Sequence, residues 1–180
     1  FWDRFVVRVA PAENNLPYRE ASRINIHRDT WGTNLYQQIN WWAPVSNVEE
    51  KNTMIFYPDY FDVPVKNTTS TWDLNIYLAN RKKGDFSYPS APQLKEDLPS
   101  NIKKIPVTIK PGEILCFSGA HLHSSSKEKS ENTRISFEIR TICENDLNSS
   151  AQAPNVDCDL QWKFPKIFKK INDNSPLKIT

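Results

Sequence analysis

The sequence predicts an all-β fold, a jelly roll of short antiparallel strands with few short helices. Eight short segments rich in β-branched and aromatic residues are separated by Pro, Gly, Asn and Asp, a pattern typical of strands joined by turns. The 180 residues include 13 prolines, which interrupt long helices. Because no helical periodicity alternates with the strands, antiparallel pairing is favoured over βαβ units. About eight such strands fit a jelly roll.

The predicted strands extend from the N-terminus to residue 142. In chain order they are Phe5–Val9, Arg23–His27, Leu35–Trp42, Met54–Tyr57, Leu74–Leu78, Ile105–Ile109, Ile114–Phe117 and Arg134–Ile142. A Pro-Gly turn at 111–112 leads into the seventh strand. In the eighth, polar residues alternate with apolar ones, so one face can pack while the other lines a site. Helical structure is expected only as short turns, for example near Phe164–Ile171.

We expect residues 1–180 to form one jelly-roll domain, since this length suits a single globular unit. Its core spans about residues 23–142. Residues 58–104 are rich in Pro, Asn, Asp and Lys and are predicted to form long loops. Residues 145–180 are polar and contain prolines, and we interpret them as a tail or lid.

The three histidines occupy two places, His27-Arg28-Asp29 and His121-Leu122-His123. On an extended segment, side chains two residues apart point the same way, so His27 and Asp29 can reach one metal ion. An imidazole from a distant strand would complete the set. Two histidines and one carboxylate on one face of a metal are typical of non-haem Fe(II) oxygenases. Taken alone, a His-x-Asp pair can equally be a histidine hydrogen-bonded to a surface carboxylate.

A second cluster strengthens the metal hypothesis. The run from Phe117 to Ser125 contains the distal histidines, and Arg134-Ile135-Ser136 follows within a predicted strand. Here the chain resembles the Fe(II)/2-oxoglutarate dioxygenases, most closely the phytanoyl-CoA-dioxygenase-like branch. That family shows His-x-Asp, a long insertion, a distal His and an Arg about eleven residues later, which is the spacing from His123 to Arg134. The resemblance covers roughly residues 23–141.

The resemblance implies a role for each motif residue. His27, Asp29 and His123 would hold Fe(II), leaving positions for the co-substrate and dioxygen. Arg134 would bind the distal carboxylate of 2-oxoglutarate, because a guanidinium makes a bidentate, charge-assisted pair. Ser136 and Ser125 would support the same carboxylate. The spacing favours His123 over His121 as the ligand, so His121 would lie beside the ligands, face the substrate, or sit exposed in a turn.

Residues 34–42 follow the proposed ligands closely. Strand alternation places Tyr36, Gln38, Asn40 and Trp42 on one face, an unusual concentration of hydrogen-bonding and aromatic groups. The functional interpretation is a pocket wall in which Gln38 and Asn40 bind co-substrate or substrate. The alternative is a solvated outer face. Trp31 and Trp42 could stack a flat substrate, although aromatic residues are more often simply part of the core.

The activity that the resemblance implies is oxidation of a small molecule coupled to conversion of 2-oxoglutarate into succinate and CO₂. Halogenating relatives have a small residue at the carboxylate position, so Asp29 implies hydroxylation, desaturation or ring formation. Two other classes stay open. One is a cupin-type metalloenzyme that uses the same ligands without 2-oxoglutarate, and the other is a non-catalytic β-sandwich module whose tryptophans bind a ligand such as a glycan.

Composition excludes several other classes. The net charge of +2 is too small and dispersed for a nucleic-acid reader, which needs a basic stripe interleaved with aromatics. No apolar run approaches the roughly 18 residues that suggest a membrane span, and no secretory signal pattern opens the chain. Three irregularly spaced cysteines favour neither a disulfide framework nor a zinc site. We therefore expect a cytoplasmic protein without nucleic-acid or membrane partners.

Overall fold

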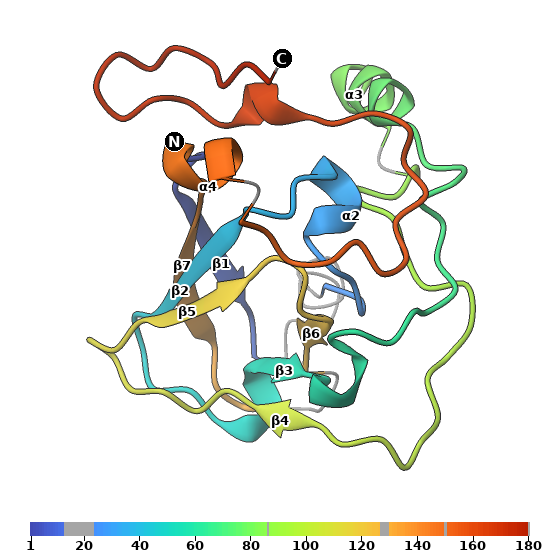
Figure 1. Ribbon diagram of the computed structural model, residues 1–180. Helices are drawn as coiled ribbons and strands as arrows, with labels where there is room; N and C mark the ends of the chain where they lie inside the picture. The colour runs from blue at the N-terminus through green and yellow to red at the C-terminus, as the bar shows by residue number, and fades with distance from the viewer. Residues whose placement is uncertain (13–23, 86, 127–129, 150, 180) are drawn as a thin grey trace.

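The computed structural model describes residues 1–12, 24–85, 87–126, 130–149 and 151–179. Two antiparallel sheets dominate it, and few helices accompany them (Figure 1). The larger sheet has the order β1-β7-β2-β5, formed by Val6–Ala10, Arg134–Thr141, Ile39–Pro44 and Leu115–Ser118. The smaller has the order β4-β3-β6, formed by Ile105–Pro106, Met54–Phe56 and His123–Ser125. The predicted β-rich jelly-roll architecture is confirmed.

The inner face of strand β7, in the larger sheet, is polar. On β7, Arg134 and Ser136 are 2% and 0% exposed, whereas Ile135 between them is 37% exposed. The alternation predicted for this strand is therefore present, but its polar side points into the molecule. On the neighbouring β1, Val7 pairs with Phe137 and is 60% exposed. Strand β7 therefore directs polar side chains inward, where they can line a binding cavity.

One predicted strand is wrong. Residues Leu74–Leu78 begin helix α3, Leu74–Lys82, which lies apart from both sheets (Figure 1). The Asp73 carboxylate caps the helix by accepting hydrogen bonds from the backbone N–H of Asn75 and Ile76 at 2.6 and 3.2 Å. Ile76 is 48% exposed. The apolar residues that suggested a strand are thus solvent-facing, and the cap was the better signal.

The cap predicts a stability effect. Replacing Asp73 by alanine removes both acceptor contacts and should lower the free energy of unfolding by about 1 kcal/mol. Thermal unfolding followed by circular dichroism measures the change. Asp59 precedes no helix of comparable length, so Asp59→Ala is the matched control and should unfold at the wild-type temperature. Equal unfolding temperatures for Asp73→Ala and wild type would contradict the capping role.

Other boundaries differ by a few residues. The predicted strand Leu35–Trp42 forms strand structure only from Ile39, because helix α2, Thr30–Thr33, ends at Asn34 in the left-handed region with φ 54°. Arg23, the first residue of another predicted strand, lies outside the described residues. From that strand His27 alone forms a β-bridge, with His123. Strand β6 was not predicted because its His-Ser-Ser sequence has no apolar signal.

The C-terminal segment packs into the body of the protein. Helix α4, Glu144–Ser149, and a 3₁₀ turn at Pro165–Ile167 are its regular elements. Cys158 and Leu160 belong to a buried cluster with Trp31 and Leu122, and Phe168 is fully buried. Figure 1 shows this segment passing α2 and continuing over the top of the molecule. The predicted tail therefore contributes core side chains. Among the described residues, no helix has the length and apolar character needed to cross a membrane.

Candidate metal centre

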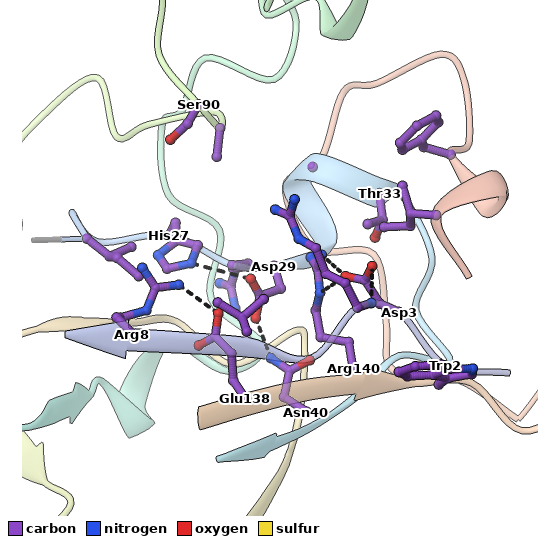
Figure 2. Close-up of a pocket in the computed structure, with 18 of the residues that line it drawn as sticks. Trp2, Asp3, Arg8, His27, Asp29, Thr33, Asn40, Ser90, Glu138 and Arg140 are labelled. Atoms are coloured by element: carbon purple, nitrogen blue, oxygen red, sulfur yellow. Dashed lines mark hydrogen bonds and ion pairs between the residues drawn. The ribbon is translucent and has the colours of Figure 1, made fainter. Parts of the chain in front are cut away.

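A β-bridge brings the two histidine motifs together. The backbone N–H of His27 donates to the carbonyl of His123 at 2.9 Å, and the N–H of His123 donates back at 3.0 Å. The two rings consequently lie side by side, with centroids 4.3 Å apart. Asp29 follows at the start of α2, and Figure 2 shows its carboxylate directed at the His27 ring. Residues almost a hundred positions apart in the sequence thus share one site.

The three side chains form a compact set of donors. His27 Nε2 lies 3.4 Å from Asp29 Oδ1, and His123 Nε2 lies 3.8 Å from Asp29 Oδ2. One ligand atom from each residue falls within 4.8 Å of the others. Both histidines are buried, while the Asp29 side chain keeps 20% exposure. Two imidazoles and one carboxylate suit a non-haem Fe(II) centre with open positions, so the donor set fits that metal.

Backbone carbonyls orient both rings. His27 Nδ1 lies 2.9 Å from the carbonyl oxygen of Asn25, and His123 Nδ1 lies 2.9 Å from that of His121. Because a carbonyl only accepts hydrogen bonds, each Nδ1 carries the proton and donates it. Each Nε2 then faces the cluster, where its lone pair becomes available to a metal once any proton on that atom is released. A hydrogen bond from Nδ1 to a backbone carbonyl commonly fixes the tautomer and ring orientation of metal-binding histidines.

The electrostatics of the cluster favour one shared proton when no metal is bound. Burial opposes charge on His27, but its hydrogen bond to Asp29 and the Asp29 charge outweigh burial and raise the pKa of His27. Burial acts against ionised Asp29 as well, yet both histidines and Arg140 hold the pKa of Asp29 well below its usual range. For His123, burial and then the charge of His27 lower the pKa to about 4. The directions of these shifts favour a proton on His27 over one on Asp29 or His123.

A metal must displace that proton, so binding should depend on pH. Below the raised pKa of His27, metal affinity should fall by about tenfold for each pH unit, because one proton is released per ion bound. Above that pKa the affinity should level off. Titration of the metal-free protein with Co(II) at pH 6, 7 and 8 measures the dependence. Equal affinities at all three pH values would show that no proton is displaced from the cluster.

Asn40 and Gln38 lie behind the carboxylate. Asn40 Nδ2 donates a short hydrogen bond to Asp29 Oδ2, and Gln38 Nε2 donates to Asn40 Oδ1 at 2.9 Å (Figure 2 draws the first contact). Thr33 Oγ1 contacts Gln38 Oε1 at 3.2 Å. All three side chains are at least 95% buried. The residues singled out as a pocket wall are thus buried, and they face the metal centre rather than solvent.

Two further predicted residues sit deeper along the inner face of β7. The Nε atom of Arg134 and the hydroxyl of Ser136 are buried and have no hydrogen-bond partner among the described residues. The Arg134 guanidinium stands 5.7 Å from the ring of Trp42. Burial, and then the neighbouring Arg8, lower the pKa of Arg134 to about 10. A buried cation beside a hydroxyl that can donate has the chemistry to bind an anion.

The remaining predicted residues divide between the site and the core. Ser125 accepts a hydrogen bond from the Ile24 N–H at 3.2 Å. Trp31 is fully buried, and its Nε1 donates to Asp157 at 2.7 Å. His121 packs against Phe61 with ring centroids 4.6 Å apart. Neither Trp31 nor His121 lines the cavity described below, whereas Trp42 does.

A cavity of about 1180 Å³ opens over the cluster. Its inner wall carries two ion pairs, Arg8 with Glu138 at 2.6 Å and Arg140 with Asp3 (Figure 2). Arg140 and Glu138 share the polar face of β7 with Arg134, so the strand alternation carried the signal for them. Asp3 and Arg8 come from the N-terminal segment, and no motif in the sequence marked them.

Comparisons with known proteins agree with this architecture. No protein-family model matches the sequence, and a search of curated proteins found no match. Among solved structures, EvdO2 from Micromonospora carbonacea var. aurantiaca matches with a TM-score of 0.51 and 11% identity over 88% of this chain and 55% of that one. A second EvdO2 structure, complexed with 2-oxoglutarate, matches with a TM-score of 0.49 and 10% identity over 76% of this chain and 50% of that one. The non-haem α-ketoglutarate-dependent carbocyclase SnoK from nogalamycin biosynthesis matches with a TM-score of 0.48 and 14% identity, over 86% of this chain and 56% of that one.

The chain spans about half the length of these structures. The likeness to EvdO2 extends over 88% of this chain. The His27, Asp29 and His123 side chains converge within it. The chain therefore shares the β-rich fold of EvdO2 and carries a compact cluster of two histidines and one aspartate.

Proposed function

We propose that this protein is an Fe(II)/2-oxoglutarate-dependent oxygenase that oxidises a small molecule. The observation that carries the proposal is the coexistence of two complementary features on one inner surface. One is the cluster of His27, Asp29 and His123, whose donor atoms lie within 4.8 Å of each other. The other is the Nε atom of Arg134 with the Ser136 hydroxyl, both buried and without a hydrogen-bond partner in the part of the chain that the structure describes. A metal alone would need only the first.

Each residue has a physical role in this proposal. His27 Nε2, His123 Nε2 and an Asp29 oxygen hold Fe(II), since backbone carbonyls already fix both rings. Arg134 and Ser136 bind a carboxylate of 2-oxoglutarate, because a desolvated guanidinium pairs strongly with a carboxylate. Ser125 retains a hydroxyl proton to donate to the same group. When bound, iron, dioxygen and 2-oxoglutarate together supply a strong oxidant while succinate and CO₂ are formed.

The cavity suits a small-molecule substrate. Its volume of about 1180 Å³ is at the upper end of ligand pockets. Trp42 and Trp72 provide apolar walls, and Asn40 and Asp29 lie at its base. Seven Arg and Lys side chains line it against three Asp and Glu, which favours a substrate with an anionic group. With Asp29 filling the carboxylate position, we expect hydroxylation, desaturation or ring formation.

The decisive experiment is an anaerobic titration of the metal-free protein with Fe(II) and then with 2-oxoglutarate. We expect a weak visible charge-transfer band from the chelate in wild type. In Arg134→Ala the same band should require roughly 10- to 100-fold more 2-oxoglutarate, since a charge-assisted bidentate pair contributes about 1.5–3 kcal/mol. Arg4→Ala, which replaces an exposed arginine that lines the cavity, is the control.

The outcomes separate the competing functions. Iron binding without a band in wild type would indicate a cupin-type metalloenzyme that does not use 2-oxoglutarate. Absence of iron binding would indicate a non-catalytic binding module. Equal 2-oxoglutarate requirements in wild type and Arg134→Ala would remove Arg134 from the co-substrate site.

A further inference from the structure

A chain of buried amides ends on the metal-ligand carboxylate. Thr33 Oγ1 lies 3.2 Å from Gln38 Oε1, Gln38 Nε2 donates to Asn40 Oδ1 at 2.9 Å, and Asn40 Nδ2 donates to Asp29 Oδ2. A carbonyl or carboxylate oxygen only accepts, so the Asn40 amide has one possible orientation: its NH₂ group faces Asp29 and its oxygen faces Gln38. The chain is directional, and every donor in it has an acceptor.

Packing holds this chain in place. Gln38 is fully buried, and a Cβ atom built on Gly119 would lie 2.8 Å from Gln38 Nε2. The backbone N–H of Gly119 also donates to the Gln38 carbonyl at 3.0 Å. The Gly119 carbonyl accepts a hydrogen bond from the backbone N–H of Thr30 at 3.3 Å. Gly119 lies four residues before His123. The amide of Gln38 is therefore fixed by the same turn that leads to the distal histidine.

We propose that Asn40, oriented by Gln38, is a positioning residue that sets the rotation of the Asp29 carboxylate. With Oδ2 held by the Asn40 amide, Oδ1 faces His27 Nε2 at 3.4 Å, and the carboxylate offers one oxygen to a metal. A carboxylate free to turn would offer both oxygens and fill a position that a co-substrate or dioxygen needs. The inference rests on the proposed function, because it assumes that Asp29 binds a metal.

This assignment differs from the co-substrate role that the strand pattern suggested for Gln38 and Asn40. Both polar atoms of the Asn40 amide already have partners within the protein. The same is true of the Gln38 amide. The two roles make opposite predictions for metal binding in the absence of 2-oxoglutarate, since only a positioning residue affects it.

The test uses Co(II) alone as the probe. Metal-free wild type, Asn40→Ala, Gln38→Met and Gln37→Ala are titrated with Co(II) while the visible d–d absorption is recorded. Asn40→Ala should weaken Co(II) binding by about 10- to 100-fold, the usual cost of losing an outer-shell partner, and should change the d–d band because the carboxylate coordinates differently. Gln38→Met should change the Co(II) affinity and the d–d band in the same direction but by less, since the Asn40 amide remains.

The control is Gln37, which lies in the turn before β2. Gln37 Nε2 donates to Gln152 at 2.9 Å in an exposed amide pair, so Gln37→Ala removes a similar hydrogen bond away from the site and should match wild type. If Asn40→Ala does not fold, Gln38→Met must still weaken binding more than Gln37→Ala. Wild-type affinity and an unchanged band in the Asn40 and Gln38 variants would overturn the inference alone. A wild-type protein that binds no Co(II) would overturn the proposed function and this inference together.

Discussion

Replacing His123 by alanine should abolish tight metal binding, whereas replacing His121 by alanine should preserve it. His123 directs Nε2 at Asp29 and forms the bridge with His27, so its loss removes one of three donors. We expect the metal affinity to fall by more than the roughly 10- to 100-fold that loss of an outer-shell partner costs, and activity to fall with it. Calorimetric titration with Co(II) or Mn(II) under anaerobic conditions measures both variants.

His121 is a well-matched control because it lies two residues away and is half-buried. Its ring packs against Phe61, and its Nδ1 contacts the Ser118 carbonyl at 3.1 Å. Its contribution to the site is the backbone oxygen that orients His123, which an alanine retains. His121→Ala should therefore bind metal within about tenfold of wild type, the lower bound for loss of an outer-shell partner. A larger loss in His121→Ala than in His123→Ala would reverse the assignment of the ligand.

The sequence predicted the ligands because their chemistry is local and rare. His27 and Asp29 are separated by one residue, and only three histidines exist in the chain, so few combinations could form a site. The alternation of β7 likewise predicted that Arg134 and Ser136 share a face. That this face points inward depends on the sheet packing, which no single strand specifies. The apolar outer residues of β1 and β7 made either orientation equally plausible.

Contacts distant in sequence were beyond prediction for the same reason. Helix α3 is a separate, local case: its exposed apolar residues suggest a strand, whereas the capping residue Asp73 indicates a helix. The C-terminal segment looked like a polar tail because its buried members, such as Cys158, Leu160 and Phe168, are scattered singly among polar residues. Their burial depends on partners in other parts of the chain, such as Trp31 and Leu122 for Cys158 and Leu160, and no periodicity within the segment encodes that.

Arg28 shows how such distant contacts support the site. It lies between the two ligands of the His-x-Asp motif and is 3% exposed. Its guanidinium donates to four backbone carbonyls, those of Tyr60, Phe61, Val63 and Ala120, at 2.6 to 3.3 Å. Its Nε donates to the Asp157 carboxylate at 3.1 Å. Through the four carbonyl contacts, Arg28 connects the motif to the loop at 60–63 and to the turn before the distal histidine. Through the ion pair with Asp157, it connects the motif to the C-terminal segment.

Replacing Asp157 by alanine should destabilise the metal-free protein by about 3–5 kcal/mol, the cost of leaving one partner of a buried ion pair uncompensated. The two side chains are only 2% and 5% exposed, so solvent cannot replace the lost charge. Trp31 Nε1 and the Val65 N–H lose their acceptor as well. Asp157→Asn should cost less, because an amide oxygen still accepts part of these bonds. Urea unfolding measures the free energy of unfolding of wild type and of both Asp157 variants.

The control is Glu96→Ala, which breaks the exposed Lys66–Glu96 pair and should change the free energy of unfolding by at most about 1 kcal/mol. Were Asp157→Ala as mild as Glu96→Ala, the ion pair between Arg28 and Asp157 would have no stabilising role.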